Sequence, residues 1–221
     1  MKIKEFVKKE VVLCVATVLA VISAFVVLPD KQYVDYIDFR TLGILLCLMC
    51  VMAGLQGMGL FRIIAQQLLT KVKTLRGIVG ILVLLCFFFS MLITNDVALI
   101  TFVPFTFTVL EMLDQRVRSR QLIPIVVLQT IAANLGSMLT PIGNPQNLYL
   151  YGKAGLGMGE FLSLMLPYTA VSLVVILLLA CCRKGLGERL ELDFARKAQL
   201  EGRLFRLIVY LVLFVVCLLA V

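Results

Sequence analysis

The sequence predicts an all-α polytopic membrane protein with about five spans, a re-entrant helical hairpin and one broken helix. Of its 221 residues, 62% are hydrophobic and only 15% are charged. A soluble domain of this size cannot bury so much apolar surface. The apolar stretches are long enough to cross a bilayer and alternate with basic loops. Two of them contain polar or helix-breaking residues, at positions 94–96 and 136–147.

Residue types exclude several classes of function. Histidine, the commonest general base and metal ligand, is absent from the chain. Most of the seven cysteines lie in apolar segments, and the CxxC pair Cys47 and Cys50 has no second pair to complete a zinc site. The net charge of +8 indicates orientation and lipid contact. We therefore expect no enzyme, no nucleic-acid partner, and no cofactor or metal beyond a Na⁺ ion that the site could hold.

Residues 1–76 are predicted to form scaffold spans and an interfacial helix. The first span covers residues 11–28, and the lysines before it place the N-terminus in the cytoplasm. No cleavage site follows, so this span stays attached. The loop at 30–38 is acidic on balance and is expected outside, and the second span covers residues 39–60. Residues 61–72 are amphipathic, with isoleucines and leucines opposite Arg62, Gln66, Gln67 and Lys71, as in a helix lying along the interface.

Residues 77–182 are predicted to form the transport region, which begins with the hairpin 77–113. Its arms flank Thr94, Asn95 and Asp96, and both outer ends meet arginines, so both ends are expected in the cytoplasm. Each arm of about 17 residues extends roughly 26 Å. Two interpretations stay open: two ordinary spans joined by a tight external turn, or a re-entrant hairpin whose tip lies inside the membrane.

The broken helix is predicted over residues 121–152. Gly136, Pro141, Gly143 and Pro145 interrupt it, and Asn144 followed by proline predicts an N-cap that restarts the helix. A span at 161–182, a cytoplasmic basic loop at 183–206 and a final span starting at 207–221 complete the chain. The final apolar run stops without a flank, so we expect that span to be truncated.

The two interruptions supply groups for both an anion and a cation. Helix N-termini carry a partial positive charge and free N–H groups, which suit an anion. Unwound carbonyls and helix C-termini suit a small cation such as Na⁺. Asp96 is the one acidic residue placed deep in an apolar stretch, where it could bind Na⁺ or exchange a proton. The alternative is that Asn95 and Asp96 merely cap the following helix.

These motifs resemble the anion permeases of the ion transporter superfamily, which include citrate and dicarboxylate carriers and arsenite-type permeases. The segment Ser90-Met-Leu-Ile-Thr94-Asn95-Asp96 with Pro104 is similar to the first hairpin motif of that superfamily. The run from Gly136 through Thr140-Pro-Ile-Gly-Asn-Pro-Gln-Asn147 is similar to its second element, on a broken helix. Residues 38–43 and 54–61 are similar to the preceding helix pair, so the resemblance covers about residues 36–182.

The resemblance implies the first half of an inverted-repeat transporter, in which substrate and coupling ion meet between the two interruptions. Carried over, the substrate-binding residues are Thr94, Asn95, Thr140, Asn144 and Asn147. The residues carried over for the coupling ion, Na⁺ or H⁺, are Ser90, Asn95, Asp96, Ser137 and Gly143. Asp96 departs from the dicarboxylate carriers, which have threonine at that position, and this leaves substrate and coupling ion open.

We therefore predict a secondary active transporter of small anions, either di- or tricarboxylates or inorganic oxyanions, working by symport or antiport in a bacterial inner membrane. Its partners are the anion, Na⁺ or H⁺, the lipid bilayer, and a second half of the transporter or another chain; a homodimer is implied by the resemblance. One alternative is a half-transporter remnant or accessory subunit that transports nothing. An intramembrane aspartyl protease is a weaker alternative, because it needs two carboxylates and only Asp96 is suitably placed.

Overall fold

A computed structural model describes Val7 and residues 10–27, 37–183, 186 and 204–221, which fall into two units, Met1–Phe39 and Arg40–Val221. The described residues form helices and no strand, which confirms the predicted all-helical class. The lysine-rich start, residues 28–36 of the first span and external loop, and nearly all of the basic loop 183–206 lie outside the described residues.

The first unit contains the helix α2 (Val11–Val26), within the range expected for the first span. None of its residues is buried within the chain, and its composition is apolar on every side. Such a helix is typical of one that contacts lipid.

The second unit begins one residue into the helix α3 (Phe39–Gly57), which is followed by α4 (Leu60–Leu69), α5 (Leu75–Ile93) and α6 (Asn95–Glu111). It continues through α7 (Gln115–Ser137), the 3₁₀ turn η2 (Pro141–Gly143), α8 (Pro145–Ala154), α9 (Met158–Cys181) and α10 (Leu204–Ala220). By length and composition, three of the described helices (α3, α5 and α9) could cross a membrane, and α2, α4 and α10 are shorter apolar helices.

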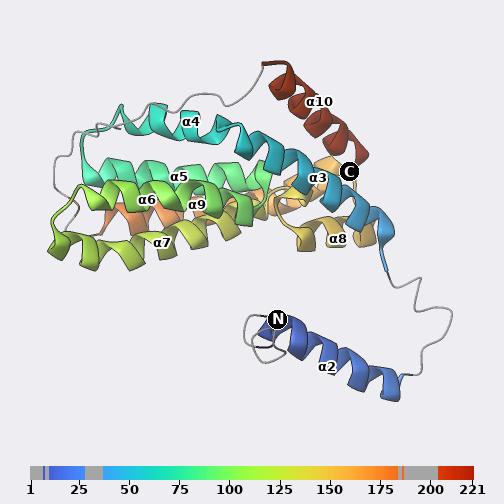
Figure 1. The fold of residues 1–221 in the computed structure, drawn as a ribbon. Coiled ribbons are helices and arrows are strands. Elements are labelled where there is room, and N and C mark those ends of the chain that lie inside the picture. The colour runs from blue at the N-terminus through green and yellow to red at the C-terminus, as the bar shows by residue number, and fades with distance from the viewer. Residues whose placement is uncertain (1–6, 8–9, 28–36, 184–185, 187–203) are drawn as a thin grey trace. The chain divides into compact units, whose positions relative to one another are not determined.

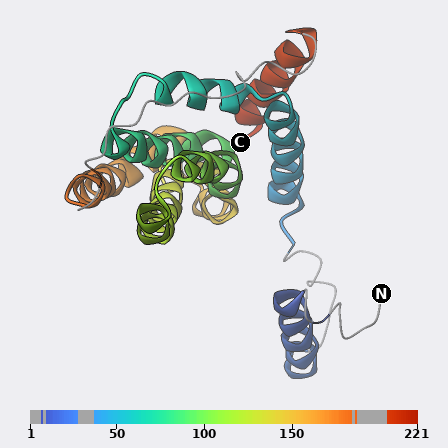
Figure 2. The ribbon, with the colours of Figure 1, turned by 60° about the vertical axis from the view of Figure 1, so that its left-hand side comes forward.

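The core of the second unit is formed by α5, α6 and α7, which lie side by side in Figure 1 and Figure 2. α9 packs against α7 and α5, and α4 packs against the hairpin. Leu82, Phe87, Phe102 and Ile125 are almost fully buried between these helices. The apolar stretches of the sequence therefore bury one face within the chain and leave the other exposed, as a membrane protein requires.

α4 is the helix expected at the interface, and it packs against the hairpin through every fourth residue. Phe61, Ala65 and Leu69 are buried on its inner face, while Arg62 and Leu68 are exposed. The chain enters α4 through Gly59, whose φ of 76° is readily adopted only by a residue without Cβ. This turn lets α4 fold back onto the hairpin directly after α3.

A buried polar contact joins the three core helices at the middle of the hairpin. The Gln129 side chain of α7 is fully buried; its Nε2 donates to Cys86 Sγ of α5 at 3.5 Å, and its Oε1 accepts from Thr106 Oγ1 of α6 at 2.7 Å. A buried amide without such partners would cost about 1–3 kcal/mol. Gln129 therefore holds both arms of the hairpin against α7.

The helix before the break starts earlier than expected, at Gln115 instead of Gln121. The arginines at 116, 118 and 120 are good helix formers, and no breaker lies between Asp114 and Gln121. Pro124 lies inside α7 without ending it. The positive charge of the three arginines indicated a cytoplasmic loop. On a helix that emerges from the membrane, however, arginine side chains are as well solvated as they are in a loop.

Candidate functional site

The hairpin tip is a single strained residue. Thr94 separates α5 from α6, and its φ of 69° with ψ of 151° is the one positive φ of a non-glycine among the described residues. For a β-branched residue this conformation costs on the order of 1–3 kcal/mol. The residue is also buried, with 8% of its surface exposed. Such strain persists only where the surrounding structure holds the backbone in place.

The first turn of α6 keeps its N–H groups available. Ala98 N–H donates to Thr94 O at 3.1 Å, and within the described chain no side chain or backbone group accepts from the N–H of Asn95, Asp96 or Val97. Asp96 is exposed and is the second residue of the helix, with no side-chain cap bond. Neither Asn95 nor Asp96 therefore forms a side-chain cap hydrogen bond, although the Asp96 carboxylate lies in the first turn of α6.

The second interruption is the unwound segment that joins α7 to α8 through η2. Asn144 is the N-cap of α8, with its Oδ1 accepting from Asn147 N–H at 2.8 Å, and Pro145 is the first helical residue. This confirms the predicted restart of the helix. A Cβ on Gly143 would lie 2.0 Å from Ser137 O, so only glycine fits there.

The side chain of Asn147 holds the break together. Its Nδ2 lies 3.3 Å from Ser137 O, 3.0 Å from Met138 O and 3.2 Å from Thr140 O. These carbonyls therefore face an amide that carries a partial positive charge. Ser137 O belongs to the carbonyls at 134–137 that the sequence suggested as cation ligands, and in this structure it faces this amide instead.

The two interruptions meet through residues that lie 39 and 49 positions apart in the chain. Asn95 Nδ2 at the tip donates to Asn134 Oδ1 at 2.9 Å, and Thr140 Oγ1 in the break donates to Met91 O of α5. Figure 1 shows the end of α7 beside the tip of the hairpin, with α8 extending beyond it. α5 and α7 approach each other closely at Gly136, where a Cβ would lie 2.0 Å from Phe87 O.

The structure brings most of the candidate residues to this junction but gives them different surroundings. Asn95, Thr140, Asn144 and Asn147 are half-buried, and Asp96 is exposed. Ser137 is buried: its Oγ donates to Asn134 O at 2.9 Å and accepts from Asn144 Nδ2 at 3.2 Å.

Ser90 is the candidate that does not face the open part of the junction. It is fully buried one turn below the tip, and its Oγ donates to Phe87 O at 2.8 Å. A bound ion could reach this hydroxyl only if α5 moved away from Gly136. In this structure Ser90 packs between α5 and α7, next to Gly136.

Sequence reasoning missed the side chain of Asn134, the residue of α7 that joins the break to the hairpin tip. A signal was present, because Asn134 is a polar residue inside an apolar run one turn before the break. Gln129, five residues earlier in α7, is also a polar residue in this apolar run, and it joins the two arms of the hairpin farther from the tip.

The oxygen atoms exposed or half-buried at this junction belong to side-chain amides and to the Asp96 carboxylate. In the part of the chain that the structure describes, no group of three His, Cys, Asp or Glu side chains could hold a metal ion. Oxygen ligands of this kind suit a hard, weakly bound ion such as Na⁺.

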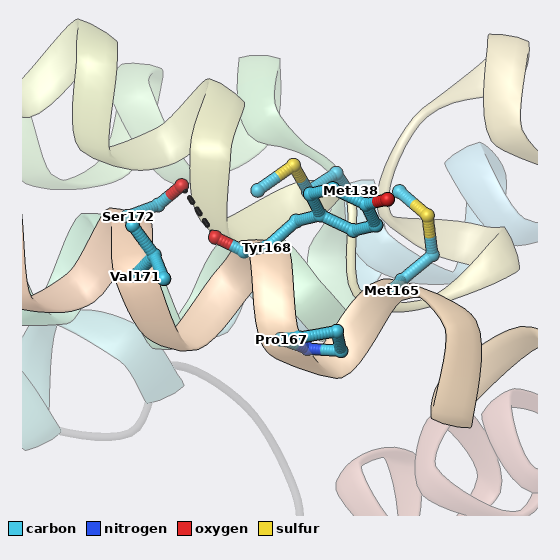
Figure 3. A pocket seen from close by; sticks show the side chains of 6 residues that line it. All are labelled: Met138, Met165, Pro167, Tyr168, Val171 and Ser172. Carbon is cyan, nitrogen blue, oxygen red and sulfur yellow. Dashed lines mark hydrogen bonds between the residues drawn. The ribbon is translucent and has the colours of Figure 1, made fainter.

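Next to the break lies an apolar groove of about 670 Å³ (Figure 3). Met138 lines it from the break, and Met165, Pro167, Tyr168, Val171 and Ser172 line it from α9. Two hydroxyls lie at its wall: Ser172 Oγ donates to the main-chain oxygen of Tyr168 at 2.7 Å, and Tyr168 carries a phenolic hydroxyl at the end of its ring. The rest of the lining is apolar and uncharged, so the groove suits an apolar group better than a small anion.

Comparison with known proteins places the chain among membrane transporters. Residues 2–221 match the protein family described as "Citrate transporter". Inner membrane protein YbiR of Escherichia coli is 33% identical over 133 residues, 60% of this chain and 34% of that protein. Uncharacterized transporter MJ0456 of Methanocaldococcus jannaschii is 36% identical over 96 residues, 43% of this chain and 27% of that protein. The matched segments thus span about a third of these relatives or less.

Proposed function

The chain belongs to the citrate transporter family, and from that membership we propose that it is a secondary active transporter of small anions, coupled to Na⁺ or H⁺. The membership confirms the resemblance to the anion permeases of the ion transporter superfamily. It makes the protein an integral membrane protein whose partners are the bilayer and a small molecule. We propose di- or tricarboxylates or inorganic oxyanions as substrates.

The contact between the two helix interruptions is the observation that carries this proposal. Asn95 and Asn134 place polar side chains at the point where the hairpin tip meets the break. Asp96 and Asn134 are exposed there on the surface of the chain. Polar groups exposed to lipid at the depth of a helix break raise the free energy of the protein. They occur where they line a cavity or contact another part of the protein or another chain. Secondary transporters place substrate and coupling ion at such points.

The first turn of α6 is the better anion site of the two helix starts. Its N–H groups at Asn95, Asp96 and Val97 have no partner within the described chain. At the start of α8, by contrast, Pro145 has no N–H and the N–H of Asn147 is engaged by Asn144, which leaves only Gln146. We therefore assign substrate contact chiefly to the hairpin tip, with Thr140 and Asn144 as neighbours.

We propose that the coupling ion binds beside the anion, at Asp96. The carboxylate of Asp96 lies beside Asn95 in sequence and is exposed, so it can bind Na⁺ directly or carry a proton. A cation next to the α6 N-terminus offsets the charge of the anion, and each ligand then raises the affinity for the other. That mutual dependence is what couples the two fluxes.

The position of α8 supports a re-entrant tip. Figure 1 shows α8 continuing past the tip, so the hairpin ends where the broken helix is interrupted and not where it finishes. The alternative, in which α5 and α6 are two ordinary spans joined by an external turn, is supported by the length of α5, which is enough to cross a bilayer. In the proposed mechanism, a second half of the transporter or another chain completes the cavity at the tip.

Uptake into proteoliposomes tests the proposal. The full-length protein should accumulate radiolabelled citrate, succinate or arsenate when an inward gradient of Na⁺ or H⁺ is imposed, and should show counterflow. Asn95→Ala and Asp96→Ala should abolish the cation dependence. Glu111→Ala, an exposed acidic residue at the other end of α6, is the matched control and should leave it unchanged. Normal coupled uptake in both tip variants would refute this site.

A further inference from the structure

The orientation of the Asn134 side-chain amide is set by its own helix. Asn134 Nδ2 donates to Thr130 O one turn earlier in α7, at 2.8 Å. A peptide carbonyl can only accept a hydrogen bond, so the amide nitrogen must face Thr130. Asn134 Oδ1 must therefore point the other way, toward the hairpin.

This orientation in turn sets the amide of Asn95. Asn134 Oδ1 lies 2.9 Å from Asn95 Nδ2, and a carbonyl oxygen can only accept. Asn95 must therefore use its nitrogen toward α7 and turn its oxygen away from Asn134. No group in the described chain donates to that oxygen. The tip thus presents an acceptor, which attracts a cation, in place of a donor, which would repel one.

The same reasoning fixes the orientation of the Asn144 amide in the break. Asn144 Oδ1 accepts from the N–H of Asn147, which can only donate, so Asn144 Nδ2 faces Ser137 Oγ at 3.2 Å. The Ser137 hydroxyl then donates to the main-chain oxygen of Asn134 at 2.9 Å. Asn134 is therefore where the two halves of the network join, because its side chain orients the tip and its carbonyl orients the break.

We propose that Asn134 is a positioning residue that holds Asn95 with its side-chain oxygen turned toward the coupling cation. This rests on the proposed function, in which a cation binds at the hairpin tip. Asn134 need not contact the ion itself; it acts through the orientation of Asn95. Without it the amide of Asn95 can turn over, and half of its orientations present N–H groups to the ion.

The test measures the cation concentration for half-maximal uptake, K0.5, in proteoliposomes with radiolabelled citrate as the probe and choline replacing Na⁺. Asn134→Leu removes the acceptor and should raise K0.5 about three- to tenfold, the effect of losing one orienting hydrogen bond. Asn134→Asp keeps an acceptor toward Asn95, loses the donor to Thr130 O and adds a negative charge near the ion, so its K0.5 should return to the wild-type value or below it. A merely structural role would change the amount of folded protein and the maximal rate without this reversal.

Thr130→Val is the matched control. Its hydroxyl donates to Val126 O within α7, so its loss removes a polar group one turn away and leaves the Thr130 carbonyl in place. K0.5 should not change. If Asn134→Leu does not fold, Asn134→Ala, which also removes the acceptor toward Asn95, replaces it in the uptake assay. A raised K0.5 in Asn134→Ala would support the proposal, and an unchanged K0.5 would overturn it.

The outcomes separate the two proposals. Cation-dependent uptake with an unchanged K0.5 in Asn134→Leu overturns the role of Asn134 and leaves the proposed function standing. Uptake by the wild type that ignores both Na⁺ and pH gradients overturns the proposed coupling, and the role of Asn134 falls with it. A raised K0.5 that aspartate restores supports both.

Discussion

Gly136 is the position where a single methyl group should separate the hairpin from the broken helix. A Cβ there would lie 2.0 Å from Phe87 O and 2.7 Å from Ser90 Oγ. Phe87 O is a backbone atom and cannot rotate away. Ordinary contact begins near 3.4 Å, so α7 and α5 would have to move apart by about 1.4 Å. Overpacking of this kind costs about 1–3 kcal/mol.

Gly80→Ala provides the matched comparison. Gly80 lies inside α5, as Gly136 lies inside α7, but nothing stands within 4 Å of a Cβ built on it. Alanine there should be neutral or stabilise the helix by about 0.5–1 kcal/mol. The two substitutions make the same chemical change, so a difference between them reports the close approach of α5 and α7.

Thermal unfolding of the purified protein in detergent, followed by size-exclusion chromatography after heating, measures the difference. Each kcal/mol shifts the Tm by about 2–4 °C in a protein of this size. Gly136→Ala should therefore lower the Tm by several degrees, while Gly80→Ala should leave it unchanged or raise it. Citrate uptake should fall in Gly136→Ala alone, because Thr140 and Asn134 move away from the hairpin. Equal Tm values for the two variants would refute the close packing.

Two further predictions follow from backbone strain and from the buried amide. Thr94→Gly should raise the Tm, because the strain of about 1–3 kcal/mol exceeds the entropy cost of glycine of about 1 kcal/mol, and a lower Tm would show that Thr94 is not strained. Uptake by this variant should nevertheless weaken as the tip loosens. Gln129→Leu should lower stability by about 1–3 kcal/mol by leaving the Thr106 hydroxyl unpaired, and Gln129→Leu with Thr106→Val should recover much of the loss in the same melting assay. No recovery in the double variant would contradict the hydrogen bond.

The position of the break could be predicted from sequence because its causes are local. Proline lacks an N–H, and Asn144 before Pro145 supplies a side-chain acceptor at a helix start. The start of α7 was predicted six residues too late because helix propensity is a weak local preference, and arginines suit a helix end as well as a loop.

The state of the candidate residues could not be predicted in the same way. Ser90 and Asp96 belong to one motif six residues apart, yet Ser90 is fully buried under Gly136 and Asp96 is exposed. Asn147 resembles a substrate ligand in sequence, but its amide nitrogen lies against three carbonyls of the break. Each outcome depends on which neighbour packs against the residue.

The sequence by itself determined that the chain is a helical membrane protein, where its helices are interrupted, and which transporter family it resembles. Those properties depend on apolar length and on residues that disturb their own backbone. Only the tertiary structure decided that Asn95 meets Asn134, that Gln129 joins both arms of the hairpin, and which atom of each amide faces the tip. An amide carries a donor and an acceptor of nearly equal size, so its direction is set by partners that lie far away in the chain.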